Sequence, residues 1–316
     1  ERVAGERKPA GDDPFEPYLD YVGARLTEDP HLWAMTLFDE VVGLGYDRSY
    51  PTFTRQIRVR GLRPHCEPCS ATKGRENAPI EHPPGEETQW DWLEPPDPPA
   101  SWGWGKNAHL LVGALAHSSK WRGHLAATEQ QPHLIAGLDA VARKLGGLTK
   151  KWRFDRMTTV CHPESGKVTA TFAAVAKHYG VQVAICPPRR GNRKGVVEKS
   201  NHTAAQRWWR TLPDDISIEE AQASLDRFCE LRGDARLRPS GVDGRASVLT
   251  VAKREPLAPV PWSPFPATLS EERTVSAQAL VAWRGNFYSV PPEPARATVT
   301  VSQQLGEQHL DIATIG

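Results

Sequence analysis

The segment that most restricts how this chain can fold is residues 86–212, where strand patterns and helix patterns follow one another in a definite order. Short apolar or alternating runs indicate strands, and apolar residues that recur every three or four positions indicate helices. The predicted elements, in chain order, are strands at 87–94, 109–117 and 120–127, a helix at 132–145, a strand at 151–155, a helix at 167–179, a strand at 181–186 and a helix at 192–212. We therefore expect three antiparallel strands, followed by strands that alternate with helices.

That order of elements is the order of a ribonuclease H-like fold. We expect an α/β core with a mixed five-stranded sheet and flanking helices. The chain has 316 residues, enough for about two domains that each bury a core. Its 39% hydrophobic and 24% charged residues are ordinary for a soluble globular protein, and the longest apolar stretch, near Leu110–Ala116, is too short to span a membrane.

Helical patterns precede this core. Residues 14–60 contain three short amphipathic stretches, and the third, which begins near Ser49, interleaves Arg55 and Arg58 with apolar residues. Three short helices with arginines on the last are typical of a helix-turn-helix module whose third helix enters a DNA groove. A plain three-helix bundle with a solvated basic face explains the pattern equally well.

A polar segment rich in proline and glycine, residues 61–84, predicts a linker between these two regions. It contains Cys66 and Cys69, spaced as half of a zinc site, and His65 and His82 would have to complete the four ligands. Two reduced surface thiols are the simpler interpretation. Five cysteines in a chain of this length favour a reducing cytosol over a disulfide framework.

The C-terminal residues alternate in short apolar runs, with turns at 284–286 and 304–307, and this pattern predicts a small β-barrel for DNA contact or oligomer packing. The expected organisation is a flexible tail at 1–13, a helix-turn-helix-like module at 14–60, a linker at 61–84, the ribonuclease H-like domain with trailing helices at 85–254, a linker at 255–272 and a truncated barrel at 273–316.

Three carboxylates occupy positions where such a core could gather them. Asp91 lies in the middle of the first strand, facing away from Trp90 and Trp92 because strand side chains alternate. Asp155 ends a strand, where parallel strands border a crevice, and Glu198 lies in the last helix. Carboxylates from three elements could hold two Mg²⁺ ions for in-line phosphoryl displacement. Three ordinary surface acids, among 38 acidic residues, are the competing interpretation.

The sequence around Glu198 is strongly basic, because residues 189–210 contain seven cations and this single acid. The cations are Arg189, Arg190, Arg193, Lys194, Lys199, Arg207 and Arg210. Such a run predicts salt-sensitive binding to DNA phosphates without sequence preference. Lys194 and Glu198 share one helix face at four-residue spacing, so one could contact the scissile phosphate while the other binds metal. Ordinary helix pairing explains the same spacing.

Several motifs in the chain resemble one known family. They are Gly85–Trp92 around Asp91, Phe154-Asp155, His178–Gly180 and, most distinctively, the run Arg193-Lys-Gly-Val-Val-Glu198. These motifs resemble the D-D-E integrase-type core of IstA-type insertion-sequence transposases, within the retroviral integrase superfamily. Residues 281–291 are similar to the small barrel of that family and of Mu transposase, and residues 45–50 resemble its second helix-turn-helix. The resemblance covers about residues 14–316.

The resemblance implies a DNA transposase in which Asp91, Asp155 and Glu198 are the catalytic metal ligands. It implies cleavage at the transposon ends by a metal-activated water, followed by attack of the freed 3′-hydroxyl on target DNA. The implied cofactor is two Mg²⁺ ions, for which Mn²⁺ can substitute. The implied partners are the terminal repeats, target DNA, an AAA+ ATPase helper and further copies of the chain on paired ends, at the bacterial nucleoid in the cytoplasm.

The chain departs from the family pattern in two places. Arg156 follows Asp155 where the family commonly has asparagine, and a cation there could occupy the second metal position. The chain opens with Glu1 and lacks the first helix-turn-helix, so we expect it to be part of a longer protein. A nuclease that hydrolyses DNA without joining it, and an inactive DNA-binding relic, are the alternatives. Glu164 is the alternative second ligand.

Overall fold

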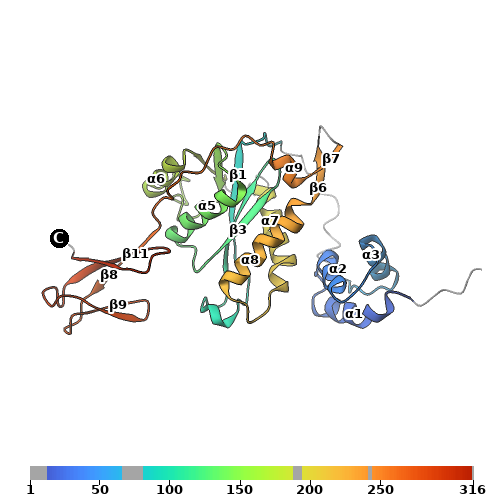
Figure 1. Ribbon diagram of the computed structural model, residues 1–316, viewed down its shortest axis with the longest axis horizontal. Coiled ribbons are helices and arrows are strands. Elements are labelled where there is room, and N and C mark those ends of the chain that lie inside the picture. Colours follow the sequence, from blue (N-terminus) through green and yellow to red (C-terminus); the bar gives the residue numbers. More distant parts are fainter. Residues whose placement is uncertain (1–12, 66–80, 188–193, 241–243, 315–316) are drawn as a thin grey trace, which may run out of the picture. The chain divides into compact units, whose positions relative to one another are not determined.

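The computed structural model describes residues 13–65, 81–187, 194–240 and 244–314 (Figure 1). Contacts divide the chain into two units, the first made of residues 1–79 and 203–211 and the second of residues 80–202 and 212–316. No helix among the described residues has the length and apolar character needed to cross a bilayer.

The first unit contains the three helices expected from the periodicity of its apolar residues. They are α1 (Leu19–Glu28), α2 (Ala34–Gly43) and α3 (Tyr50–Val59), preceded by a 3-10 turn (Glu16–Tyr18), and the unit also includes the 3-10 turn Trp209–Thr211. Phe53 of α3 is fully buried, and its ring centroid lies 5.5 Å from that of Phe38 and 5.7 Å from that of Tyr46. Because Phe53 points inward, Arg55 and Arg58 lie on the exposed face of α3.

The second unit is built on one five-stranded mixed sheet (Figure 1). Its strands are β1 (Glu87–Leu93), β2 (His109–Leu115), β3 (Trp121–Ala126), β4 (Lys151–Phe154) and β5 (Gln182–Ile185). The strand order is β3-β2-β1-β4-β5, with antiparallel pairing on the β2 side of β1 and parallel pairing on the β4 side. The structure therefore confirms the ribonuclease H-like core.

The helices of this unit follow the predicted alternation. They are η2 (Ala100–Trp102), α5 (Gln131–Leu145), α6 (Ala170–Tyr179), α7 (Gly195–Arg207), α8 (Ile218–Phe228), a π-helical segment (Cys229–Asp234) and α9 (Val248–Ala252). Only residues 195–202 of α7 belong to this unit. A small hairpin of β6 (Leu237–Ser240) and β7 (Gly244–Ser247) precedes α9. The helix predicted at 167–179 begins later, at Ala170, because Val168 pairs with Cys161 in a short β-bridge.

Trp90 of β1 organises the core on one face of the sheet. Its side chain is fully buried, and its ring centroid lies 5.3 Å from that of Trp152 in β4. Gly113 is its partner in β2, and a Cβ atom there would come within 2.5 Å of the Trp90 ring, so no larger residue fits without movement. Since side chains alternate along a strand, the inward Trp90 places Asp91 on the opposite face, as expected.

An ion pair joins β3 to the segment after α8. The Arg122 guanidinium donates two hydrogen bonds to the Asp234 carboxylate, at 2.9 and 2.7 Å, and each side chain is only 7% exposed. Burial by itself lowers the pKa of Arg122, but the hydrogen bonds and charge of Asp234 raise it overall, so the guanidinium stays charged. The two buried charges neutralise one another.

The C-terminal strands form two small antiparallel sheets. The first contains β8 (Thr268–Thr274), β11 (Thr298–Gln304) and β12 (Asp311–Thr314), and the second contains β9 (Leu280–Trp283) and β10 (Asn286–Ser289). Buried residues of both sheets, including Val281, Trp283 and Val299, share one apolar cluster. Strand β8 begins at Thr268, inside the segment expected to be a linker. The two sheets do not establish a closed barrel, which stays a prediction.

Candidate active site

Two of the predicted carboxylates meet at one buried lysine. Asp91 lies in β1 and Asp155 directly follows β4, the parallel neighbour of β1. Between them, Lys194 Nζ donates hydrogen bonds to Asp91 Oδ1 at 2.7 Å and to Asp155 Oδ2 at 2.6 Å. The Lys194 side chain is 1% exposed, whereas that of Asp155 is 55% exposed. One ammonium group therefore compensates both carboxylates at the edge of a solvent-facing site.

The charges of these three groups depend on one another. Burial by itself lowers the pKa of Lys194, but the neighbouring Asp91 and Asp155 carboxylates raise the pKa above its ordinary value, so the ammonium stays charged. Burial raises the pKa of Asp91, and the charge of Asp155 adds to this effect, while Lys194 acts in the opposite direction. The site therefore gathers negative charge around a position that a cation occupies.

Gln89 attaches the start of helix α7 to β1. Its side chain is fully buried, and its Oε1 accepts hydrogen bonds from the backbone N–H groups of Val196 and Val197, at 3.2 and 3.3 Å. These amides belong to the first turn of the helix, where backbone N–H groups have no partner within the helix itself. Gln89 lies two residues before Asp91, so both side chains project from the same face of β1.

The side-chain amide nitrogen of Gln89 is also hydrogen-bonded. Its Nε2 donates to Glu87 Oε1 at 3.2 Å, and the Glu87 carboxylate accepts two hydrogen bonds from Arg153 of β4, at 2.9 and 2.7 Å. Further along α7, Asn201 Nδ2 donates to Asp91 Oδ2 at 2.9 Å. Together these contacts hold α7 against the strand that carries Asp91.

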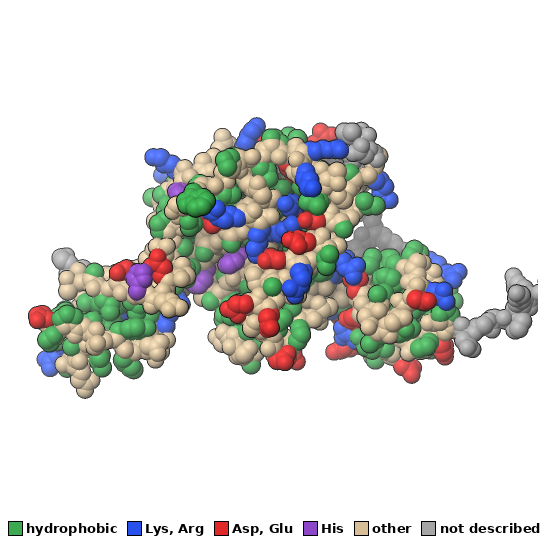
Figure 2. Space-filling model, in the orientation of Figure 1, with side chains coloured by type: hydrophobic (Ala, Val, Ile, Leu, Met, Phe, Trp, Pro, Cys, Tyr) green, Lys and Arg blue, Asp and Glu red, His purple; other side chains and the backbone are tan. Residues whose placement is uncertain are grey.

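Glu198 lies on α7 between Lys194 and Asn201, with its side chain exposed. Burial raises its pKa, the negative charges of Asp91 and Asp155 raise it further, and Lys194 lowers it. The third predicted carboxylate therefore responds to the charges of the other two. The oxygens of Asp91, Asp155 and Glu198 do not all lie within 4.8 Å of one another, and Lys194 occupies the space between the two aspartates. Figure 2 shows acidic and basic side chains next to one another in the middle of the visible face of the second unit.

Arg156 does not lie between the carboxylates, contrary to the possibility raised by its place after Asp155. Its Nη1 donates to the backbone carbonyls of Pro163 and Glu164, at 2.6 and 2.8 Å. The guanidinium is thus used to hold the loop that follows β4. The cation between the aspartates is Lys194, which the sequence pattern assigned to phosphate contact.

The predicted DNA contacts differ in their surroundings. Arg55, Arg58 and Lys199 are exposed, Lys194 is buried, and Arg207 Nη2 lies 2.5 Å from Asp39 Oδ2 within the first unit. Arg189, Arg190 and Arg193 lie outside the described residues, as do Cys66 and Cys69 of the possible zinc site. All these assignments stay predictions.

Sequence reasoning gave no role to Gln89, Asn201 or the group formed by Glu94, His109 and Glu129. Spacing offered a signal for the first two residues. Gln89 lies two positions before Asp91 in a strand, and Asn201 lies three positions after Glu198 in a helix, so each shares a face with a predicted ligand. The third group has no local signal, because its members come from three separate segments.

Comparisons with known proteins find similarity to transposases. Residues 260–310 match the family described as the Mu transposase C-terminal domain. The chain is 27% identical over 275 residues to the transposase for insertion sequences IS1326/IS1353 of Pseudomonas aeruginosa, covering 84% of this chain and 52% of that protein. It is 24% identical over 299 residues to the transposase for insertion sequence element IS21 of the same species, covering 93% and 73%.

The chain thus spans about half the length of the first of these relatives, 52%. Among solved structures, the catalytic core of HTLV-2 integrase in complex with magnesium aligns with a TM-score of 0.39 and 13% identity, covering 54% of this chain and 97% of that chain.

Proposed function

We propose that this chain cuts transposon ends and joins them to target DNA. The proposal follows from its membership of the IS21 or IstA-type family of insertion-sequence transposases with an integrase-like core. The observation that carries this proposal is the pair of aspartates around a buried cation, with Glu198 one turn further along α7. Carboxylates that converge on one positive charge from separate elements are the arrangement that metal-dependent phosphoryl transfer requires.

The side chains at this position fit Mg²⁺. The donors are carboxylate oxygens, which hard divalent cations prefer. The Lys194 ammonium lies between Asp91 and Asp155 and supplies positive charge at this position. We propose that Asp91, Asp155 and Glu198 would hold two Mg²⁺ ions, with Mn²⁺ as a substitute. When bound, such ions activate the attacking water or 3′-hydroxyl and stabilise the leaving oxygen.

The residues around the carboxylates would then set their geometry. Asn201 donates a hydrogen bond to Asp91 Oδ2, and Gln89 accepts hydrogen bonds from the first turn of α7. These contacts would fix the position of the helix that carries Glu198. Lys194 would leave the carboxylates when they bind metal. Its ammonium would then be free to contact a DNA phosphate, the role expected from its spacing to Glu198.

The partners proposed for this chain follow from its family and its charge. The exposed Arg55, Arg58 and Lys199 would contact phosphates of the transposon ends or target DNA. We also propose that an AAA+ ATPase helper selects the target, and that several copies of the chain assemble on paired ends at the bacterial nucleoid.

A strand-transfer assay tests the proposal. The chain would be incubated with supercoiled plasmid, Mn²⁺ and pre-cut oligonucleotides that carry the transposon ends, as wild type and as Asp91→Asn, Asp155→Ala and Glu198→Gln. We expect each substitution to lower the yield of joined product by about 100-fold or more, because each removes a proposed metal ligand and even residues that only support a ligand contribute 10–100-fold. Glu164→Gln is the matched control, since Glu164 is an exposed carboxylate on the loop that Arg156 holds; it should retain activity.

The other outcomes separate the alternatives. Nicked plasmid without joined product would indicate a nuclease. Tight, salt-sensitive DNA binding without any product would indicate an inactive relic. Loss of joining in Glu164→Gln but not in Asp155→Ala would transfer the second ligand to Glu164.

A further inference from the structure

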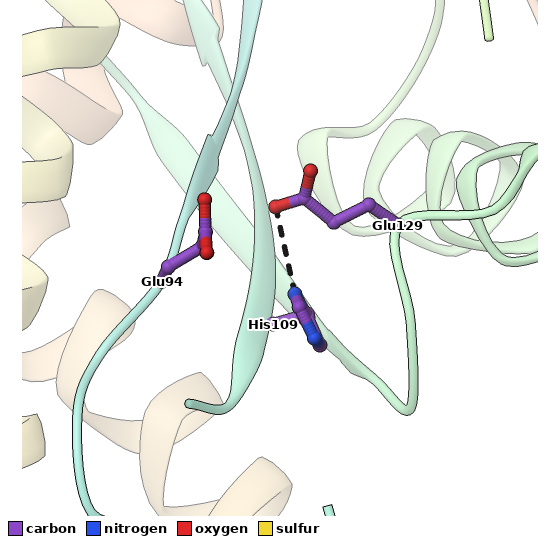
Figure 3. Close-up of side chains that lie close together, drawn as sticks. All are labelled: Glu94, His109 and Glu129. Carbon is purple, nitrogen blue, oxygen red and sulfur yellow. Dashed lines mark ion pairs between the residues drawn. The ribbon is translucent and has the colours of Figure 1, made fainter. Parts of the chain in front are cut away.

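A group of three side chains of metal-ligating types, none of them Asp91 or Asp155, lies at the ends of strands of the same sheet (Figure 3). Glu94 follows β1, His109 begins β2, and Glu129 lies between β3 and α5. One potential ligand atom from each residue lies within 4.8 Å of the other two. Among the described residues, this is the only set of three or more His, Cys, Asp or Glu side chains with that property.

Strand register brings the three side chains together. Leu93 pairs with Leu110 across β1 and β2, so the next position on each strand places Glu94 opposite His109. His109 also pairs with Ala126, the last residue of β3, and the chain reaches Glu129 three residues later. Figure 3 shows the side chains approaching one another from these three segments, with an ion pair drawn between His109 and Glu129.

Two polar atoms of this group are buried and lack a hydrogen-bond partner. They are Nδ1 of His109 and Oε1 of Glu129, which lie 3.5 Å apart, too far for a hydrogen bond. Buried polar atoms are almost always paired in proteins, and leaving one unpaired costs about 1–3 kcal/mol. Since the two atoms belong to side chains that also ligate metals, a bound cation would satisfy both.

The charge of the group points in the same direction. Glu94 and Glu129 are both carboxylates, and the negative charge of Asp91 also acts on Glu129. In the part of the chain that the structure describes, Glu129 has an ion pair only with His109, and Glu94 has none. Asp91 and Asp155, by contrast, share a lysine of this chain. Among the described residues, the Glu94 group therefore has no lysine or arginine partner, and its only ion pair is the one between His109 and Glu129.

We propose that Glu94, His109 and Glu129 bind one divalent cation of the zinc class, at a site separate from the proposed catalytic carboxylates. An imidazole nitrogen beside two carboxylates favours Zn²⁺ over Mg²⁺, which prefers oxygen ligands alone. Ligands about 2.0–2.2 Å from a tetrahedral Zn²⁺ lie about 3.4 Å from one another. This separation matches the 3.5 Å between His109 Nδ1 and Glu129 Oε1. Three protein ligands leave the fourth position to water.

The site would connect three segments of the second unit. A cation there would join the end of β1, the start of β2 and the segment before α5. Its ligand Glu94 lies three residues after Asp91 in the sequence. A ligand that binds only the folded state stabilises it in proportion to the logarithm of its concentration over its Kd. Zn²⁺ at this site would therefore stabilise the strand that carries Asp91.

Zinc titration of the full chain tests this proposal. The background would be Cys66→Ser/Cys69→Ser, because those cysteines are a separate candidate for zinc. Isothermal titration calorimetry with Zn²⁺ should give one site per chain. Visible absorption after titration with Co²⁺ reports whether the bound ion has the tetrahedral coordination expected for a zinc site. We expect His109→Gln and Glu129→Gln to weaken Zn²⁺ binding about 100-fold or more, since even residues that only support a ligand contribute 10–100-fold.

Two control variants make the test specific. Asp91→Asn/Glu198→Gln removes the proposed catalytic ligands and should leave the zinc site intact, and His162→Gln removes an exposed histidine outside the group. Thermal unfolding in EDTA checks folding: His109→Gln and the parent should unfold at similar temperatures, and only the parent should gain stability when Zn²⁺ is added.

Three results would overturn the proposal. One is the absence of Zn²⁺ binding by the parent. Another is unchanged binding in both His109→Gln and Glu129→Gln. The last is loss of binding in Asp91→Asn/Glu198→Gln, which would place the ion at the catalytic carboxylates. If His109→Gln fails to fold in EDTA, the isosteric Glu129→Gln decides between these outcomes.

Discussion

The two aspartates that we propose as metal ligands, Asp91 and Asp155, and the Glu94 group belong to the same sheet region, yet their negative charge is compensated in different ways. Asp91 and Asp155 share the ammonium of Lys194, which comes from 39 positions beyond Asp155 in the sequence. Glu94 and Glu129 are close to His109 but have no lysine or arginine partner among the described residues. The protein therefore supplies a cation at the site where we propose Mg²⁺, and leaves the other group to a cation from solution.

Two other buried carboxylates of the second unit are also compensated by a basic side chain of the protein. Glu87 is paired with Arg153, and Asp234 is paired with Arg122, in each case through two hydrogen bonds. Removing a charge from water is unfavourable unless a partner compensates it. Buried Glu255 differs, because its carboxylate accepts hydrogen bonds from the backbone N–H groups of Gly85 and Ser118. Within the described parts of the chain, the Glu94 group has neither kind of compensation, since its only ion pair is between His109 and Glu129.

The largest effect on stability should come from breaking a fully internal pair. Arg122→Met leaves the Asp234 carboxylate, only 7% exposed, without its partner. We expect the free energy of unfolding, measured by urea denaturation, to fall by about 3–5 kcal/mol. The double variant Arg122→Met/Asp234→Leu is the matched control and should recover most of this loss. If the free energy of unfolding fell by less than 1 kcal/mol in the single variant, the Asp234 carboxylate would not depend on Arg122 for compensation.

A smaller effect should follow from Gln89→Leu. The substitution removes the acceptor of the Val196 and Val197 amides at the start of α7, and unpaired buried groups of this kind cost about 1–3 kcal/mol. We expect strand transfer, measured well below the unfolding temperature, to fall about 10-fold or more because Glu198 loses its position. Gln182→Leu, on the exposed end of β5, should leave both quantities unchanged. Normal joining by Gln89→Leu would show that Glu198 needs no such support.

Lys194→Met should make stability depend on metal. In EDTA the two aspartates would repel one another, and we expect a loss of about 1–2 kcal/mol, below the value for fully buried pairs because Asp155 is 55% exposed. Added Mg²⁺ should restore the lost stability of the variant. The stability of the wild type should change less, because Mg²⁺ must first displace its lysine. Lys199→Met, an exposed position on α7, the helix that begins directly after Lys194, is the control. Thermal unfolding with and without Mg²⁺ measures the difference, and equal responses would refute it.

The smallest effect concerns the pH dependence of the Glu94 group without metal. Burial and the neighbouring carboxylates raise the pKa of Glu129 above the 4.5 of an unperturbed glutamate, so the folded state holds this proton more tightly than the unfolded state. The associated stability is present below pH 4.5 and is lost as pH rises through the folded pKa. Glu129→Gln should therefore be more stable than wild type at pH 7 in EDTA, by a few tenths of a kcal/mol after solvent screening. Equal stability of the two proteins at pH 4 is the internal control. If Glu129→Gln were less stable than wild type at pH 7, the pKa of Glu129 would not be raised in the folded state.

Residue patterns along the chain were sufficient to predict most of the second unit. The alternation in β1 placed Trp90 inward and Asp91 outward, and the order of strands and helices predicted the mixed sheet, because both depend on local periodicity. Positions of helix ends were less accurate: in the described part of the segment predicted as a helix at 192–212, the α-helix ends at Arg207. Its last turns become a 3-10 segment, which periodicity does not reveal.

The sequence by itself determined which elements form and which acids stand at strand ends and on the last helix. Only the tertiary structure decided the partners of those acids. Lys194 was assigned to a phosphate from its spacing to Glu198, yet it lies buried between two aspartates, because the start of α7 is held against β1 by Gln89. The group of Glu94, His109 and Glu129 likewise exists only once β1, β2 and β3 pair in register. Periodicity reports the face on which a residue lies, whereas its partners depend on which segments the fold brings beside that face.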